Sequence, residues 1–348
     1  MTAPVLPIAI TQGDPAGVGG EIIAKAFRDD PELTSGCFVV GDLAHMRRAV
    51  AILAQPGELA VPVAVLASPA DLAQVPPRCI PLLQVGTPAS ACVAWGRVDA
   101  AAGHIAADAV VWAARAALQG EIAALVTAPL HKEALSAAGV AFPGHTELLQ
   151  AEAARHRGVP VAQMPVRMML ANDELRTVLV SIHVSLRDAI AAVTRDQVLQ
   201  TLRITHAALQ GMLGRLPRIA VAGLNPHAGE GGLFGREEIE SIAPAIAAAR
   251  AEGIDADGPH PPDTIFMRAR AAHGKAGAFD VVVAMYHDQG LIPVKYLGVE
   301  QGVNVTLGLP LVRTSPDHGT AFDIAGTGRA DPTSLLQALR MARRLAGG

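Results

Sequence analysis

Short runs of aliphatic residues alternate with longer stretches of helical composition along most of this 348-residue chain. This alternation is typical of α/β proteins. Several runs, such as residues 281–285, are apolar at every position, as expected for parallel strands that helices cover on both faces. The predicted strands are residues 6–10, 38–40, 63–66, 123–126, 167–170, 178–182, 219–222 and 281–285. The predicted helices are residues 20–27, 99–118, 196–212, 237–251 and 332–345. The sequence therefore predicts a doubly wound, mostly parallel sheet.

Composition and charge exclude several classes of function. With 51% hydrophobic and 17% charged residues, the chain is globular. A net charge of −4, without blocks of like charge, argues against nucleic-acid binding. The long uncharged stretches are interrupted by Pro and polar residues, so we expect no membrane span. No basic segment precedes the first apolar run, so we expect a cytoplasmic protein. Three dispersed cysteines predict buried thiols in a reducing compartment.

Two glycine-rich turns follow predicted strands, at residues 13–20 and 229–232. Their glycines would let a ligand approach the backbone closely. Neither turn completes the G-x-G-x-x-G pattern, because Ile22 and Phe234 stand where the last glycine should be. The chain is therefore not a Rossmann fold with that fingerprint. Each turn is either a ligand-binding turn or a tight turn ahead of a helix.

Three histidines stand directly after apolar strands: His183, His227 and His287. The carboxyl ends of parallel strands meet at one edge of a sheet, so these side chains could converge. Three imidazoles that leave a coordination position open can hold a catalytic divalent metal. Asp263 or Asp288 could add a ligand or orient one. The alternative is that each histidine only makes hydrogen bonds at its strand end.

A Gly-His-Thr turn at residues 144–146 precedes a predicted helix and would present backbone amides to an anion. Lys295, Asn304 and Arg313 follow further along the chain. Two cations and an amide donor are the groups that a phosphorylated carboxylate requires. The alternative is that the cations are solvated surface residues.

The segment 317–332 contains few bulky apolar residues and matches neither a strand nor a helix. Its pattern, HGxAxDIAGxGxAxP, resembles the adenosine-binding loop of the isocitrate and isopropylmalate dehydrogenases. Those enzymes bind a dinucleotide without a Rossmann fingerprint. The resemblance implies that the cofactor-binding residues are Asp317, His318, Gly319, Ala321, Asp323 and Gly326.

Taken together, these segments resemble the 4-hydroxythreonine-4-phosphate dehydrogenase family of vitamin B6 synthesis. The matching motifs are GDPAGVGGE (13–21), VTAPLHKEAL (126–135), GHTE (144–147), SIHVSLRD (181–188), LNPHAGEGG (224–232), YHDQG (286–290) and the segment 303–331. The resemblance implies a two-domain α/β/α sandwich like isocitrate dehydrogenase. We expect a dinucleotide-side domain at residues 1–128 with 308–348, and a metal, substrate and dimerisation domain at residues 129–307.

The family assigns the metal to the three strand-end histidines, which are His183, His227 and His287 here. It assigns substrate contacts to His145, Thr146, Lys295, Asn304 and Arg313. The implied partner is a second copy of the chain, because family members are homodimers that share the metal between subunits. The implied cofactors are NAD or NADP and a divalent ion, with zinc, cobalt and magnesium as candidates. The implied reaction is oxidation of 4-phosphohydroxy-L-threonine to a 3-keto acid, which decarboxylates to 3-amino-2-oxopropyl phosphate.

Departures from the family pattern leave the substrate open. Gly13-Asp14 stands where many members have Gly-Glu, and Gly19-Gly20 where Gly-Pro is common. Paralogues with such features oxidise D-threonate or D-erythronate 4-phosphate, or a terephthalate cis-dihydrodiol. The proton acceptor is Lys295, Asp288 or a metal-bound hydroxide. Outside this class, the alternatives are a metal-dependent hydrolase or lyase, which leaves segment 317–332 without a purpose, and a non-catalytic regulator.

Overall fold

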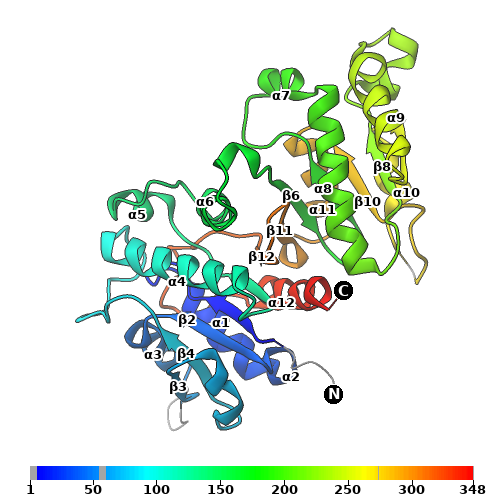
Figure 1. The fold of residues 1–348 in the computed structure, drawn as a ribbon. Helices are drawn as coiled ribbons and strands as arrows, with labels where there is room; N and C mark the ends of the chain where they lie inside the picture. Colours follow the sequence, from blue (N-terminus) through cyan, green and yellow to red (C-terminus); the bar gives the residue numbers. More distant parts are fainter. Residues whose placement is uncertain (1–5, 55–59, 273, 348) are drawn as a thin grey trace. The chain divides into compact units, whose positions relative to one another are not determined.

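The computed structural model describes residues 6–54, 60–272 and 274–347, which form two compact units (Figure 1). Unit 1 contains Met1–Pro165 and Leu309–Ala346, and unit 2 contains Val166–Gly308. The chain therefore returns to its first unit after completing the second. Residues 129–165, which we expected in the second domain, belong to unit 1 in this division.

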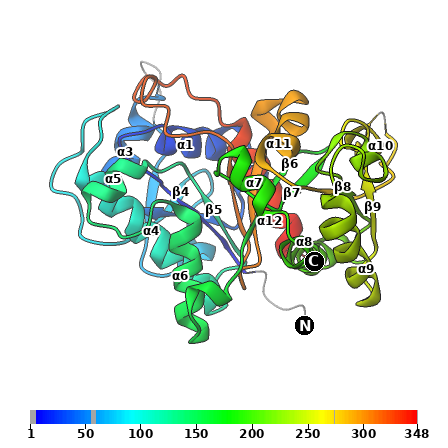
Figure 2. The same ribbon diagram turned by 90° about the horizontal axis from the view of Figure 1, so that it is seen from above.

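Unit 1 is a parallel α/β layer structure. Its strands run in the order β3-β4-β2-β1-β5-β12, and each described pair is parallel. The strands are β1 (Ile8–Thr11), β2 (Cys37–Gly41), β3 (Val63–Leu66), β4 (Ile80–Gln84), β5 (Ala124–Thr127) and β12 (Arg313–Pro316). The helices are α1 (Gly19–Asp29), α2 (Pro31–Thr34), α3 (Leu43–Ala51), α4 (Ala100–Leu118), α5 (Lys132–Ala137), α6 (His145–Arg157) and α12 (Thr333–Ala346). Figure 2 shows α1 and α3 on one side of these strands, and α4 and α6 on the other.

Small residues let α4 lie close to the unit 1 strands. Ala109 and Ala113 of α4 are fully buried against Phe38 and Leu125, which come from β2 and β5. The Phe38 ring meets the Trp112 ring edge-to-face, with 5.9 Å between centroids. An edge-to-face pair adds about 1 kcal/mol beyond burial. The strand residues are apolar on both faces because helices cover both.

Unit 2 combines parallel and antiparallel strands in the order β11-β6-β7-β10-β8-β9. Strand β6 is antiparallel to β11 and β7, whereas β7, β10, β8 and β9 are parallel. The strands are β6 (Arg167–Ala171), β7 (Arg176–Leu179), β8 (Ile219–Ala222), β9 (Ala256–His260), β10 (Val281–Ala284) and β11 (Val303–Leu307). The helices are α7 (Leu186–Ala192), α8 (Arg195–Leu213), α9 (Ala243–Ala251), α10 (Ile265–Ala269) and α11 (His287–Tyr296).

Gly290 lets α11 pack closely against strands of unit 2. A Cβ at this position would lie 2.5 Å from Leu179 Cδ2 and 3.0 Å from Ala284 Cβ, so a side chain here would displace Leu179 and crowd Ala284. Leu291 and Val294 of the same helix are buried in the core of the unit. The first residue of α11, His287, is thereby held directly after the end of β10.

The α/β class, the mostly parallel pairing and all eight predicted strands are confirmed. The five predicted helices are also present, although residues 238–242 form a π-helical turn before α9. The prediction of three buried thiols is wrong, because Cys92 is exposed and only Cys37 is buried. No helix in the described part of the chain has the length and apolarity needed to span a bilayer.

Candidate functional site

The three strand-end histidines all belong to unit 2 and follow neighbouring parallel strands. His183 follows β7, His287 follows β10 and His227 follows β8, and β10 pairs with both β7 and β8. His183 and His227 have φ values of 47° and 53°, in the left-handed region that non-glycine residues rarely adopt. Strained backbone of this kind concentrates at functional sites.

His183 and His287 lie close together. Their ring centroids are 5.6 Å apart, with the rings tilted at 42°. The centroid of an imidazole lies about 3 Å from an ion that its nitrogen binds, so both rings can reach one ion. His287 Nδ1 lies 2.7 Å from Asp288 Oδ1. A carboxylate on one ring nitrogen holds the proton there and leaves the other nitrogen free for a metal.

His227 is not brought into a three-ligand group with them. Its ring packs 6.2 Å from the Phe234 ring and borders a hollow together with Asp263 and Asp288. His183 and His287 line a second hollow, which Asp288 also borders. Among the residues that the structure describes, no three His, Cys, Asp or Glu side chains lie close enough to hold an ion. The structure therefore brings His183 and His287 together but not His227. Both predicted carboxylates, Asp263 and Asp288, border the hollow that His227 lines.

The predicted anion-binding residues are split between the units. Lys295 lies on α11 and Asn304 on β11 of unit 2, both half-buried. In unit 1, Arg313 begins β12 beside the end of β5, and its Nη2 and Nε donate to Thr127 Oγ1 at 2.8 and 3.1 Å. Arg313 is only 4% exposed, and burial lowers its pKa to about 10.

His145 and Thr146 open α6 in the same unit, as predicted from the Gly-His-Thr turn. Burial, followed by the positive charge of Arg313, holds the pKa of His145 well below its usual value. The His145 Nε2 atom is buried without a hydrogen-bond partner in the described part of the chain. A buried cation, an uncommitted ring nitrogen and the first turn of a helix together form a setting that suits an anion.

The segment after β12 packs against the turn after β1. Val18 N donates to Thr320 O at 3.0 Å, and Gly326 N donates to Glu21 Oε1 at 2.5 Å across 305 residues. Gly326 has a φ of 80°, and a Cβ there would lie 2.5 Å from the Trp95 ring. The two loops that the sequence suggested separately therefore form one structure.

The remaining predicted cofactor residues lie in the same loop. His318 Nδ1 lies 2.9 Å from Gly319 O, and Asp317 N donates to Ser334 Oγ at 3.2 Å. Ala321 has a φ of 43°, and Asp323 is exposed. Residues 317–328 thus form an ordered turn that is neither helix nor strand.

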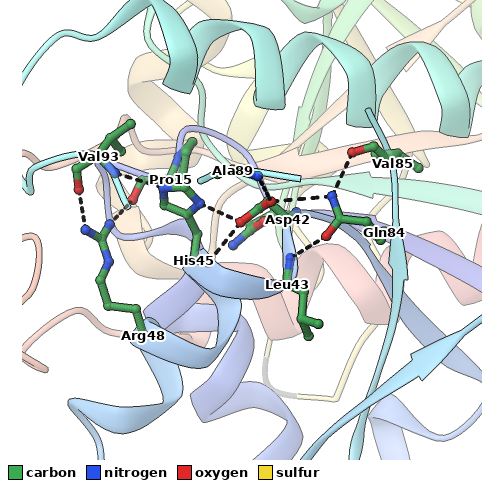
Figure 3. A network of polar contacts seen from close by, with 10 residues as sticks. Pro15, Asp42, Leu43, His45, Arg48, Gln84, Val85, Ala89 and Val93 are labelled. Carbon is green, nitrogen blue, oxygen red and sulfur yellow. Dashed lines mark hydrogen bonds and ion pairs between the residues drawn. The ribbon is translucent and has the colours of Figure 1, made fainter. Parts of the chain in front are cut away.

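A buried polar network that the sequence analysis missed connects α3 to residues 84–93 and to Pro15 in the turn after β1 (Figure 3). His45 Nδ1 lies 2.7 Å from Asp42 Oδ1, and His45 Nε2 accepts from Val93 N at 3.0 Å. Because Nε2 accepts, the neutral ring carries its proton on Nδ1. Burial lowers the pKa of His45, in keeping with this neutral form. Arg48 stacks 3.7 Å over the Trp95 ring and donates to Val93 O.

Unfilled acceptors lie in the turn after β1. Asp14 is fully buried, with Oδ1 accepting from Ala16 N at 2.8 Å, and burial raises the pKa of this carboxyl to about 6. Asp14 Oδ2, Glu21 Oε2 and Thr11 Oγ1 are buried without hydrogen-bond partners in residues 6–54, 60–272 and 274–347. Nothing in the sequence pattern distinguishes these acceptors from ordinary turn residues.

The fold and these sites define an α/β protein with imidazoles after the ends of parallel strands and a buried arginine close to an uncommitted ring nitrogen, a setting that suits an anion. Comparison with known proteins places it more narrowly. The family described as "Pyridoxal phosphate biosynthetic protein PdxA" matches residues 34–342. The chain belongs to this family.

Relatives of the chain match it over nearly its full length. It is 54% identical over 340 residues to 4-hydroxythreonine-4-phosphate dehydrogenase of Beijerinckia indica, covering 97% of this chain and 95% of that protein. It is 43% identical over 339 residues to D-threonate 4-phosphate dehydrogenase of Pectobacterium atrosepticum, covering 97% and 99%. The crystal structure of 4-hydroxythreonine-4-phosphate dehydrogenase from Klebsiella pneumoniae superposes with a TM-score of 0.85 at 40% identity, covering 100% of both chains. The predicted family and its fold are therefore confirmed.

Proposed function

We propose that this chain is a metal-dependent NAD(P) dehydrogenase that oxidises 4-phosphohydroxy-L-threonine in pyridoxal phosphate synthesis. The product is a 3-keto acid that decarboxylates to 3-amino-2-oxopropyl phosphate. The observation that carries the proposal is the His183–His287 pair with Asp288 on the second ring, in a chain 54% identical to a relative of that name.

The residues present fit both groups that the reaction needs. The paired imidazoles at 5.6 Å fit one divalent ion, for which zinc, cobalt and magnesium are the candidates. The unfilled acceptors Asp14 Oδ2, Glu21 Oε2 and Thr11 Oγ1, beside the segment after β12, fit a ligand rich in hydroxyl and amide donors. NAD and NADP are such ligands. When bound, the ion supplies a Lewis acid for the substrate hydroxyl and the dinucleotide supplies the hydride acceptor.

The chain's own residues bind and orient the substrate in this proposal. Arg313, His145 and Thr146 receive the phosphate in this proposal, because a buried cation and an uncommitted ring nitrogen lie near the first turn of α6. Lys295 and Asn304 of unit 2 contact the remaining polar groups. Asp288 keeps the proton of His287 on Nδ1 and so presents Nε2 to the ion. Lys295 and Asp288 are the side chains proposed to accept the hydroxyl proton.

A homodimer would complete the ligand set. His227 does not join the other two histidines within the described chain, and the segments that follow His183, His227 and His287 carry exposed apolar side chains. Leu233, six residues after His227, is 74% exposed, and Leu186, three residues after His183, is 60% exposed. Where exposed apolar residues are contiguous they mark an association surface, and we infer that these residues belong to one. We propose that two cytoplasmic copies associate there, so that one histidine of each metal site comes from the partner subunit.

The test is reduction of NAD and NADP by the metal-loaded protein with a panel of substrates. The panel contains 4-phosphohydroxy-L-threonine, D-threonate and D-erythronate 4-phosphates, and the cis-dihydrodiol of terephthalate. We expect turnover of 4-phosphohydroxy-L-threonine. D-threonate 4-phosphate is the second candidate, because the 43% identical relative is named for it. Preference for this substrate would leave the proposed reaction type unchanged but place the chain in another pathway. The proposal would be contradicted if no substrate of the panel were oxidised with any of the metals.

A further inference from the structure

The loop that carries His227 has a strained backbone. Residues 227–231 all have positive φ: 53° at His227, 53° at Ala228, 80° at Gly229, 43° at Glu230 and 68° at Gly231. Three of the five are not glycine, and each such residue costs about 1 kcal/mol or more in this conformation. Such a run persists only where its surroundings hold it in place. The loop therefore needs an anchor.

The Glu238 carboxylate is that anchor. It is 3% exposed, and its Oε1 accepts from the backbone N–H groups of Leu224 and Asn225, both at 2.7 Å. Its Oε2 accepts from Asn225 Nδ2 at 2.9 Å. Hydrogen bonds to an ionised carboxylate are about twice as strong as neutral ones. One carboxylate thus fixes the backbone just before Pro226 and His227.

The loop is also built around this carboxylate sterically. A Cβ on Gly223 would lie 3.1 Å from Glu238 Oε1, and one on Gly229 would lie 2.7 Å from Oε2. The carboxylate therefore occupies the space enclosed by residues 223–229. Glu238 is itself the first residue of the π-helical turn Glu238–Ile242, a rare geometry that is frequent at functional sites.

We propose that Glu238 is a positioning residue for His227: its carboxylate holds the strained loop so that the imidazole is presented to the metal. The inference rests on the proposed function, because it takes His227 as a ligand. Loss of the carboxylate releases Leu224 N and Asn225 N, and the loop then relaxes toward unstrained backbone. His227 would have to be reordered before it binds the ion, so metal affinity falls without any change in the ligands themselves.

Glu238→Gln tests this, with Glu237→Gln as the matched control. Asn225 Nδ2 donates to both carboxylates, at 2.7 Å to Glu237 Oε2 and at 2.9 Å to Glu238 Oε2. A glutamine at position 238 leaves two arrangements. Either its NH2 group faces the NH2 group of Asn225, or Asn225 flips and turns its amide oxygen toward the Glu237 carboxylate. Glu237 is half-buried and has no bond to the backbone of residues 224–225 among its described contacts, so an amide there can turn to accept instead.

The readout is titration of the metal-free full-length protein with Co²⁺, followed by its visible absorption. We expect E238Q to raise the Kd for Co²⁺ by about 10- to 100-fold, the usual effect of losing a partner that orients a ligand, and E237Q to leave it within about twofold. Circular dichroism checks that each variant is folded. If E238Q does not fold, E238D, which keeps the charge but shortens its reach, is titrated in the same way with the same expectation.

A double-mutant cycle with His227→Ala separates positioning from a general structural effect. In the H227A background, E238Q should change Co²⁺ affinity by less than about twofold. An unchanged Kd for E238Q alone, or an equal loss in both backgrounds, overturns the proposal. Absence of Co²⁺ binding by the wild-type protein overturns it together with the metal site of the proposed function. Wild-type binding with an unaffected E238Q overturns this inference alone.

Discussion

Replacing the buried Arg313 by methionine should remove anion binding while leaving the protein as stable or more stable. Burial lowers the pKa of Arg313 from 12.5 to about 10, and each pKa unit corresponds to about 1.4 kcal/mol, so burying this charge costs about 3 kcal/mol. The substitution also removes the hydrogen bonds of the guanidinium, including those to Thr127 Oγ1, at a loss of about 1.5 to 3 kcal/mol. Methionine fills a similar volume with no charge to desolvate. The expected net change runs from zero to about 1.5 kcal/mol of added stability.

The assay is urea unfolding followed by circular dichroism, with and without inorganic phosphate. Phosphate should raise the midpoint of the wild-type protein, because a ligand that binds only the folded state stabilises it, and should leave that of R313M unchanged. Arg195→Met is the control, since Arg195 is half-exposed and pairs with Asp196 at 3.4 Å. It should change stability by less than about 1 kcal/mol and keep the phosphate effect. A loss above about 3 kcal/mol in R313M, or a phosphate effect equal to the wild-type one, would refute the reasoning.

Three further substitutions test other parts of the structure. Asp280→Asn should destabilise the protein by about 2 kcal/mol at pH 7, because Arg215 and Arg218 hold the pKa of Asp280 well below its usual value. Urea unfolding at a series of pH values should show this difference in stability shrinking below about pH 4, where the carboxyl of the unfolded chain becomes protonated. A difference that does not change with pH would contradict this. Asp288→Asn should weaken Co²⁺ binding by about 10- to 100-fold through His287, and equal titration curves would argue against that role. Gly326→Ala should raise the KM for the dinucleotide about tenfold, because the added Cβ strains the loop. The kcat of the same variant serves as the comparison. An unchanged KM would show that this loop does not bind the dinucleotide.

The strands that sequence reasoning found are those made of continuous aliphatic residues. It missed β4, β9, β11 and β12 because these strands break the pattern. Strand β9 reads ADGPH and lies at the end of the strand order, where glycine and proline are tolerated. Strand β12 reads RTSP and is buried although polar, since Arg313 and Thr314 find hydrogen-bond partners there. Burial of a polar strand depends on distant partners, which local patterning does not reveal.

The candidate site could be predicted where it follows directly from strand ends. The positions of His183, His227 and His287 after neighbouring strands were predictable from the rule that parallel strands end at one edge. Glu238 was not, because an acidic residue in the first turn of a helix is an ordinary start signal and its contact with residues 224–225 is tertiary. The same holds for His45, whose bond to Val93 spans 48 residues.

We propose that this chain oxidises a phosphorylated hydroxy acid at a metal site built on the strand-end histidines. The most direct measurement follows NAD(P)H formation from 4-phosphohydroxy-L-threonine while Co²⁺ is titrated into metal-free protein, with Co²⁺ absorption recorded in the same cuvette. We expect no turnover without metal, and a rate that rises in parallel with the absorption until the site is full. Undiminished turnover by the metal-free protein, or a full absorption change without any turnover, would contradict it.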